Sequence, residues 1–228
     1  MNKMISLSVA ALSALAFAAS AQAAASLSNG DFTTPAVSGA NAPAFQTFSA
    51  STPDYIGSWK VSSGTVDLIG TYWTNPAGSA SVDLDGNTPG AISQAISGLK
   101  TGQHFDVRFL FSGNPKGSEH GGNPVKTLIV NLDDGSSRTL TFDTTAVGNT
   151  TGDMRWKSES LAFTATGGSN VLQFASGDTD PNSLWGPAVA GVSIAAPEPA
   201  TWAMMLIGFG GLGAALRMNR RRSAVAAA

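Results

Sequence analysis

Two adjacent aromatic residues, Tyr72 and Trp73, are the side chains of this chain with the clearest chemical use. A glycine stands shortly before them and Asn75-Pro76 follows, which predicts a loop in which both rings are partly exposed. An exposed ring can stack on the apolar C–H face of a sugar, while planar polar side chains fix the orientation of the sugar. We therefore expect Trp73 to form a stacking platform for carbohydrate, with Asp67, Asp83 or Asn75 supplying hydrogen bonds nearby.

Three other tryptophans of the central region have rings of the same kind: Trp59, Trp156 and Trp185. Trp59 precedes Lys60-Val61 and is expected in the core, because a buried tryptophan removes a large apolar area from water. For each aromatic residue taken singly, a structural role is the simpler interpretation. The adjacent pair in a loop is therefore the best candidate for binding.

The acidic segment Asp178-Thr179-Asp180-Pro181-Asn182 places oxygen ligands at alternate positions, as in the first half of a calcium-binding loop. Its sixth position is Ser183 rather than Gly and its twelfth is Val189 rather than Glu, so an EF-hand is excluded. An acidic turn is the simpler interpretation, because Asp, Asn and Pro are ordinary turn residues. Asp178 and Asp180 are kept as candidate calcium ligands.

Carboxylates near the expected strand ends offer a second route to a calcium site. Asp31, Asp67, Asp83 and Asp85 could converge on one ion, and Asp31 and Asp85 are the candidate ligands among them. The simpler interpretation is that these carboxylates are solvated at strand edges. Apart from this structural calcium, no cofactor is expected.

No catalytic residue is expected. The segment Gly117-Ser118-Glu119-His120-Gly121 lacks the Gly-x-Ser-x-Gly pattern of a nucleophile elbow. His104 and His120 are the two histidines, and their spacing is not that of a zinc motif. Glu119 and Glu159 have no evident carboxyl partner for glycoside hydrolysis, although Asp pairs stay open.

Charge and cysteine content narrow the function classes further. Residues Ala24–Ala196 contain 8 Lys and Arg against 14 Asp and Glu, a net charge of −6. An acidic domain without a basic patch argues against nucleic acid as a partner. The chain has no cysteine, which excludes disulfides, thiolate metal sites and cysteine nucleophiles.

Apolar residues alternate with polar ones throughout the central region, which predicts β-strands. The clearest strand is 105–111, where Phe105, Val107, Phe109 and Phe111 share one face and Leu110 lies on the other. Further alternating sets are Val66 with Leu68, Val82 with Leu84, Ile92 with Ile96, Leu128 with Val130 and Leu132, Leu140 with Phe142, Leu161 with Phe163, Leu172 with Phe174, and Val192 with Ile194. About ten short strands separated by Gly, Asn and Asp turns predict a two-sheet antiparallel β-sandwich.

The two ends of the chain carry targeting signals. Lys3, an apolar run to Ala19 and the small-residue box Ala21-Gln22-Ala23 predict a secretory signal peptide over residues 1–23. The sandwich domain is then expected over 24–196, a length that suits one core.

The tail 197–228 contains a short motif over 197–203, an uncharged apolar run over 200–216 and a basic segment over 217–222. The run would span roughly 26 Å as a helix, against a hydrocarbon core of ~30 Å, and the arginines beyond it should stay cytoplasmic. This order resembles a PEP-CTERM sorting signal, an alternative being an ordinary anchor helix. The residues that carry the resemblance are Pro197, Glu198, Pro199, Trp202, Ala203, Arg220, Arg221 and Arg222.

The central region also resembles a known family. The segments that carry this resemblance are Asn29-Gly30-Asp31-Phe32, Gly64 to Gly70, Ser81 to Gly86, Gly90 to Gln94, Phe109 to Asn114 and Gly186 to Ser193. The set looks like the choice-of-anchor C family of bacterial surface domains, which implies a galactose-binding-like jelly roll. Relatives commonly carry an Asp on the last strand where this chain has Ala190, and in related jelly rolls that carboxylate helps to hold calcium.

Together these features predict an exported, non-enzymatic protein that binds carbohydrate or exopolysaccharide. The PEP-CTERM resemblance implies an exosortase and export machinery as partners, with transient membrane contact through the apolar run. The expected location is the cell surface or extracellular matrix of a Gram-negative-type cell. A structural matrix protein without a small ligand and a secreted polysaccharide hydrolase are the alternatives.

Overall fold

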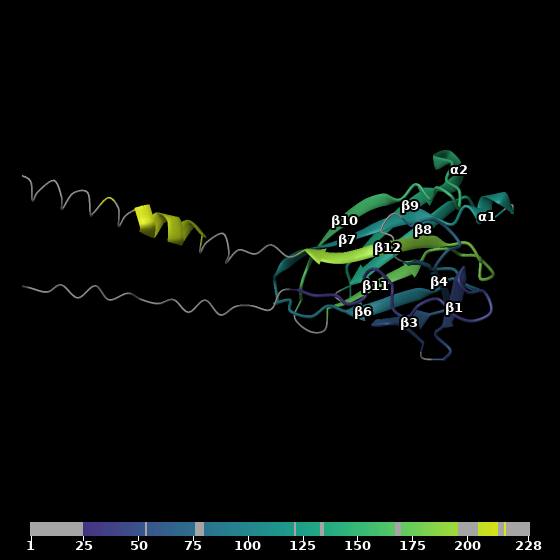
Figure 1. Ribbon diagram of the computed structural model, residues 1–228, viewed down its shortest axis with the longest axis horizontal. Helices are drawn as coiled ribbons and strands as arrows, with labels where there is room; N and C mark the ends of the chain where they lie inside the picture. The colour runs from purple at the N-terminus through teal and green to yellow at the C-terminus, as the bar shows by residue number, and fades with distance from the viewer. Residues whose placement is uncertain are drawn as a thin grey trace, which may run out of the picture. The chain divides into compact units, whose positions relative to one another are not determined.

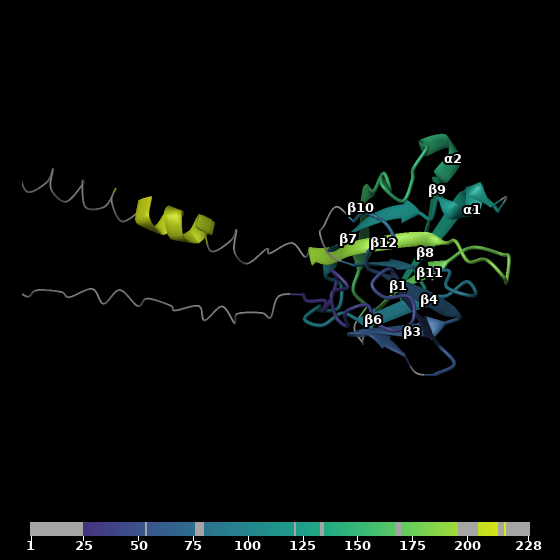
Figure 2. The same cartoon turned by 45° about the vertical axis from the view of Figure 1, so that its right-hand side comes forward.

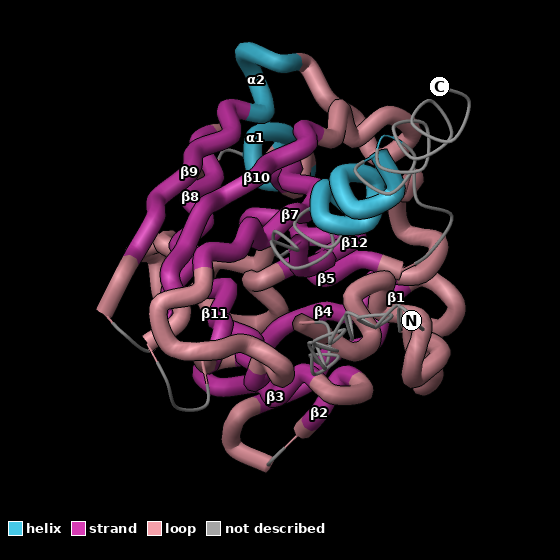
Figure 3. Tube along the Cα trace, turned by 90° about the vertical axis from the view of Figure 1, so that its left-hand side faces the viewer, coloured by secondary structure: helices cyan, strands magenta, loops and turns pink. Residues whose placement is uncertain are grey.

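The computed structural model describes residues 25–52, 54–75, 80–120, 122–132, 135–166, 170–195, 205–213 and 217. Its described residues between 25 and 195 form twelve strands in two antiparallel sheets of six strands each, which confirms the predicted all-β sandwich. Figure 1 labels the strands in chain order, and Figure 3 shows the two layers, with β7, β10 and β12 in one and β8, β9 and β11 in the other.

Sheet 1 contains, in spatial order, β1 (Phe45–Ser49), β4 (Thr65–Ile69), β5 (Ser81–Asp83), β12 (Pro187–Ala195), β7 (His104–Gly113) and β10 (Lys157–Thr164). Sheet 2 contains β2 (Tyr55–Ile56), β3 (Trp59–Ser63), β6 (Ala91–Ala95), β11 (Val171–Ser176), β8 (Val125–Leu132) and β9 (Ser137–Asp143). Strands β5 to β12 give the orders β5-β12-β7-β10 and β6-β11-β8-β9, the jelly-roll arrangement of two Greek keys. The remaining strands extend one edge of each sheet.

The core lies between the two sheets, as the period-two pattern predicts. On β7, Phe105, Val107, Phe109 and Phe111 are all buried in it, whereas Leu110 lies on the outer face of sheet 1. The predicted strand and its face assignment are both confirmed.

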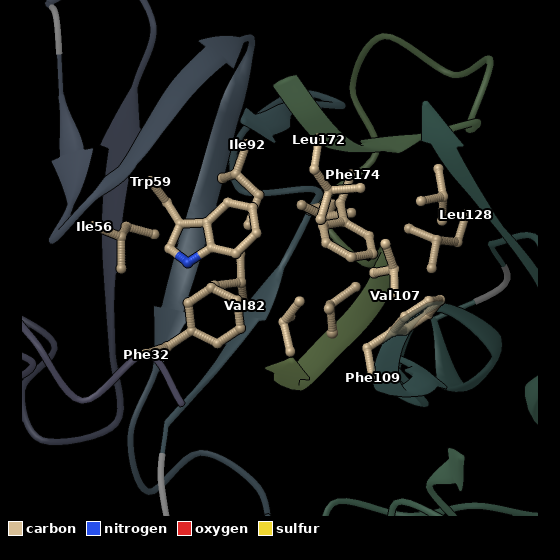
Figure 4. Close-up of a cluster of buried hydrophobic side chains, with 14 of the residues drawn as sticks. Phe32, Ile56, Trp59, Val82, Ile92, Val107, Phe109, Leu128, Leu172 and Phe174 are labelled. Carbon is tan, nitrogen blue, oxygen red and sulfur yellow. The ribbon is translucent and has the colours of Figure 1, made fainter. Parts of the chain in front are cut away.

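Trp59 of β3 is completely buried in this core, as expected. Its ring lies 5.6 Å from that of Phe32 and 5.8 Å from that of Phe174, measured between ring centroids. Figure 4 shows these rings among aliphatic side chains of both sheets, including Val82 of sheet 1 and Ile92 of sheet 2. Aromatic pairs at this spacing add to the stability that burial of their area provides.

Two four-residue helices, which the sequence pattern does not predict, stand in the described loops. Helix α1 covers Lys116–Glu119 and helix α2 covers Thr144–Val147. Asp143 caps α2 because its carboxylate accepts hydrogen bonds from the backbone N–H groups of Thr145 and Ala146. Both helices lie at the end of the sandwich opposite to the end of β12, as Figures 1 and 2 show.

The C-terminal tail is described only in part. Residues 205–213 are helical, and no helix within the described part of the chain is both long and apolar enough to cross a membrane. The rest of the predicted span 200–216 lies outside the described residues. The same holds for the predicted signal peptide 1–23, the motif 197–203 and Arg220, Arg221 and Arg222.

Candidate functional site

A cleft of about 200 Å³ opens on the outer face of sheet 1, over strands β1, β4 and β5. Its lining residues come from these strands and from loops far apart in sequence: Phe45, Thr47, Asp67, Ile69, Tyr72, Asp83, Gly86, Asn87, Asn114, Leu184 and Trp185. Three of the predicted ligand-binding residues, Tyr72, Asp67 and Asp83, therefore line one cleft.

Asp67 and Asp83 form the polar floor of this cleft. Their neighbours in sequence face the core, so period-two alternation places both carboxylates on the outer face of the sheet. The two residues are direct partners in the β4–β5 register, a position at which Cβ atoms stand roughly 4.5–5.5 Å apart. Burial raises the pKa of Asp67, while a hydrogen bond of 2.5 Å from the Thr47 hydroxyl lowers it.

Asp83 is only 2% exposed, and both of its oxygens have donors. Its Oδ1 accepts the backbone N–H groups of Asp85 at 3.0 Å and Gly186 at 2.9 Å, and its Oδ2 accepts Asn114 Nδ2 at 2.8 Å. Burial, and then the nearby Asp85 charge, raise the pKa of Asp83 well above its ordinary value, although these donors act against the rise. The expectation of a solvated strand-edge carboxylate is wrong for Asp83, because loops cover this part of the sheet.

Gly186 must be glycine for this arrangement to form. A Cβ at this position would lie 2.6 Å from Asp85 Cγ and 2.7 Å from Asp85 N. The loop can therefore approach β5 closely enough to donate its N–H to Asp83 only without a side chain.

Two half-buried aromatic side chains, Tyr72 and Trp185, stand at the rim of the cleft. Tyr72 packs edge-on against Phe45, with ring centroids 5.8 Å apart. Trp185 is stacked on His120, at 5.3 Å and an interplanar angle of 13°. Both rings are therefore held by packing while part of each remains open to a ligand.

Trp73 does not form the predicted stacking platform. It is 4% exposed and packs into a second apolar cluster on the outer face of sheet 1, with Ile69, Met154 and Ala188. Its indole N–H donates a 2.8 Å hydrogen bond to the Ser81 hydroxyl. The prediction for Trp73 is wrong because the loop folds back over an apolar part of the sheet, and the ring is the apolar group that anchors it.

Asn75 lies away from the cleft as well. It lines a broader hollow of about 570 Å³, together with Thr74, Leu110, Asp153, Met154, Arg155, Trp156 and Ser158. The indole of Trp156 donates to the Thr74 carbonyl at 3.0 Å, and the Thr74 hydroxyl donates to the Gly152 carbonyl at 3.1 Å. These bonds fix the segment 71–75, which contributes Tyr72 to the cleft and Asn75 to the hollow.

The family model described as "Protein of unknown function (DUF642)" matches residues 25–195. The chain belongs to the DUF642 family. The sequence resemblance points instead to the choice-of-anchor C family. That family name is not confirmed. A PEP-CTERM protein-sorting motif matches residues 195–222, which confirms the predicted sorting signal and implies exosortase processing and export in a Gram-negative-type cell.

The chain is similar to other proteins both in sequence and in structure. Halomucin of Haloquadratum walsbyi is 45% identical over 56 residues, which are 25% of this chain and 1% of that protein. A CBM35 from Paenibacillus barcinonensis covers 67% of this chain and 99% of its own at 15% identity, with a TM-score of 0.40. A family 35 carbohydrate-binding module from Clostridium thermocellum covers 66% and 98% at 14% identity, with a TM-score of 0.42. Likeness at this level does not identify a ligand.

Behind the cleft of the DUF642 domain lies a buried carboxylate, Asp85, with no exposed surface. Neither of its oxygens has a partner in good hydrogen-bond geometry, although the hydroxyls of Ser176 and Ser183 are near enough to interact with the carboxylate. Burial is the main reason that the pKa of Asp85 is raised to about 6, and the charge of Asp178 raises it as well. The hydroxyls of Ser176 and Ser183 and the ammonium group of Lys126 lower this pKa. The expectation of solvation is wrong for Asp85 too.

The predicted calcium ligands Asp31, Asp85, Asp178 and Asp180 do not converge. Among the described side chains, no three His, Asp or Glu groups gather closely enough to hold a metal ion. The acidic segment is a turn: Asp178 Oδ1 accepts the N–H of Asp180 at 3.0 Å, and Asp180 Oδ1 accepts the N–H of Asn182 at 2.9 Å. Asp31 lies in a separate exposed turn, where it accepts the N–H of Thr33 at 3.4 Å.

Sequence reasoning does not assign three of the lining residues, Trp185, Asn87 and Asn114, to the site. The ring of Trp185 is of a type that can stack on a sugar, and Asn114 lies in one of the family-like segments. Asn87 follows the end of β5, Asn114 follows the end of β7, and Trp185 precedes the start of β12, so only the topology brings the three residues together.

Proposed function

We propose that the DUF642 domain of this chain is a non-catalytic carbohydrate-binding module of an exported surface protein. The observation that carries the proposal is one cleft with Tyr72 and Trp185 at its rim and Asp67, Asp83 and Asn114 at its floor. Few polar groups among apolar and aromatic walls are typical of small-molecule sites. Aromatic faces suit the C–H patches of a sugar, and the carboxylates and amides suit its hydroxyls.

The floor is rigid before any ligand arrives. Asp83 is fixed by three donors, and Asn114 is held in turn because its Oδ1 accepts the N–H of Lys116 at 3.0 Å. Trp185 is restrained by its stacking on His120. Binding then requires little ordering of side chains, and this raises affinity for a given contact area.

The sorting motif supplies the context for such a module. A protein exported with a PEP-CTERM signal meets the polysaccharides of the cell surface or matrix, and exopolysaccharide is the ligand class that we propose. A matrix protein without a small ligand is the structural alternative. It predicts that no glycan binds this cleft.

Glycoside hydrolysis is a second candidate that one observation favours. Asp67 and Asp83 are cross-strand partners in the cleft, and the raised pKa of Asp67 or Asp83 would suit one of them to the role of general acid. Against it, both oxygens of Asp83 already accept hydrogen bonds from the protein. A carboxylate occupied in this way is poorly placed to attack a sugar or to transfer a proton.

The test is binding of the purified protein to a panel of neutral and acidic polysaccharides, with and without calcium. Tyr72→Ala and Trp185→Ala should each weaken the affinity for the bound glycan by about tenfold or more, since a few Tyr and Trp side chains commonly supply most of the binding energy. Tyr55→Ala is the matched control, because Tyr55 is an exposed aromatic of β2 in the other sheet.

Three results would contradict the proposal: no glycan binds, the control weakens binding as much, or the glycan is cleaved. Release of new reducing ends from the bound glycan, abolished by Asp67→Asn, would establish the hydrolase instead. Thermal unfolding of each variant shows whether a loss of binding is a loss of fold.

A further inference from the structure

The cleft is acidic. Among the described residues that line it, Asp67 and Asp83 are carboxylates and none is Lys, Arg or His. The cleft therefore offers a bound sugar two acidic groups, of which Asp67 is the more exposed, and no cation. A ligand with its own carboxylate would meet repulsion that a neutral ligand does not meet.

The nearest lysines do not reverse this charge. Lys116 lies near Tyr72 but its ammonium is paired with Glu119, three residues along α1. Lys126 is buried behind the cleft, where its ammonium is close to Gly117 and lies in the field of three carboxylates, those of Asp178, Asp83 and Asp85. Both ammonium groups therefore already have acidic neighbours, and neither Lys116 nor Lys126 lines the cleft to pair with a ligand carboxylate.

The cleft is also small. Its volume of about 200 Å³ is below the roughly 300–1,000 Å³ of pockets that enclose drug-sized ligands. One sugar ring fits such a space, whereas several consecutive rings need a longer groove. A chain end or a side branch is therefore the part of a polysaccharide that can enter.

We propose that the cleft takes a single sugar ring without a carboxylate, at a chain end or branch, and rejects uronic acids. This inference rests on the carbohydrate-binding function proposed above. A hydroxymethyl group beside Asp67 can donate a hydrogen bond to its free oxygen, since Thr47 occupies only Oδ1. A carboxylate in the same place has no proton to donate and adds a like charge in a partly desolvated site, which is discrimination by repulsion.

Matched sugar pairs test the inference. The methyl glycosides of galactose, glucose and mannose differ from those of galacturonate, glucuronate and mannuronate by one group, CH₂OH against COO⁻. Binding of each is measured with the full chain in detergent, at low salt and about pH 8. For the neutral sugar that binds, the uronate should bind at least tenfold more weakly. The neutral single ring should bind nearly as tightly as an oligosaccharide that ends in it.

Asp67→Asn sharpens the test because it removes one charge and keeps the shape. The ratio of the two dissociation constants should fall at least threefold in this variant. Asp106→Asn is the matched control, because Asp106 lies on the same face of sheet 1 but far from the cleft. It is seven residues along β7 from Gly113, which precedes the cleft residue Asn114. Seven residues of a strand span roughly 23 Å at 3.3 Å per residue. Asp106→Asn should leave the ratio unchanged.

The outcomes separate this inference from the function on which it rests. Equal or tighter binding of the uronate overturns the inference and leaves the carbohydrate-binding function standing. Binding of oligosaccharides without binding of any single neutral ring overturns the single-ring part. Failure of every sugar and polysaccharide to bind overturns the function itself.

Discussion

The two faces of sheet 1 are built from the same strands but are covered by different parts of the protein. The inner face meets sheet 2 in an apolar core in which Phe and Val alternate with outward residues. The outer face carries a smaller apolar cluster around Trp73 beside a cleft with two carboxylates. The inner face is covered by a sheet, whereas the outer face is covered by loops that come from distant parts of the sequence.

This difference shows what alternation determines. Alternation places Asp67 and Asp83 on the outer face of the sheet, but it does not decide whether that face is exposed to solvent. Asp83 is buried by Asn114 and Gly186, which are 31 and 103 residues away in sequence. Exposure of the outer face depends on loop packing, and function is located where that packing leaves an opening.

The largest expected effect tests the inner face. Phe109→Ala should lower the free energy of unfolding by about 3–5 kcal/mol, because it removes a fully packed ring and leaves a cavity. Leu110→Ala, the next residue on the outer face, should cost less than half as much, since Leu110 lines the open hollow. Denaturant unfolding of both variants measures the difference. Equal losses would mean that both faces of β7 are packed to the same degree.

The second prediction concerns pH and Asp85. Because its pKa is raised from 3.8 to about 6, the folded state holds a proton that the unfolded state has released between these values. The contribution of Asp85 to the free energy of unfolding is therefore fully present below pH 3.8 and is lost as the pH rises to about 6. The loss is about 3 kcal/mol, at ~1.4 kcal/mol per pKa unit. Asp85→Asn should remove this fall from the profile of unfolding free energy against pH.

Ser183→Ala gives the opposite check on the same group. The Ser183 hydroxyl lowers the pKa of Asp85, so its removal should raise that pKa further and extend the loss of stability to higher pH. A wild-type profile that matches the profile of Asp85→Asn between pH 4 and 7 would show that Asp85 is not strained by burial.

The third and smallest effect concerns the anchor of the 71–75 loop. Trp73→Phe keeps an aromatic ring in the outer cluster and removes the buried bond to Ser81, which should cost about 1–3 kcal/mol. Glycan affinity should stay within about twofold of wild type, because Trp73 does not line the cleft. A large loss of affinity in a variant with a normal melting temperature would restore Trp73 as a ligand contact.

Sequence pattern predicts the core of this protein well for a physical reason. Period-two burial is a local property of a strand, so the segments 105–111, 66–68 and 82–84 show their buried faces in the sequence itself. The burial of Trp59 in the core is predicted as well, because Trp59 lies in a strand.

The site could be predicted only in part. Tyr72, Asp67 and Asp83 are indicated by residue type and by one strand or loop each, and all three line the cleft. Trp73 could not be placed, because nothing in a loop sequence says which of two adjacent rings turns inward. Trp185 and Asn114 could not be joined to the site, because their proximity is a product of the jelly-roll order.

The most direct test of the account is an NMR titration of the tryptophan indole N–H signals with the glycan that binds. Residues 24–196 contain Trp59, Trp73, Trp156 and Trp185, which lie in the core, the outer cluster, the hollow and the cleft, respectively. We predict that the Trp185 signal moves most and that those of Trp59 and Trp156 stay in place. Movement of Trp156 with a stationary Trp185 would put the ligand in the hollow and contradict the account.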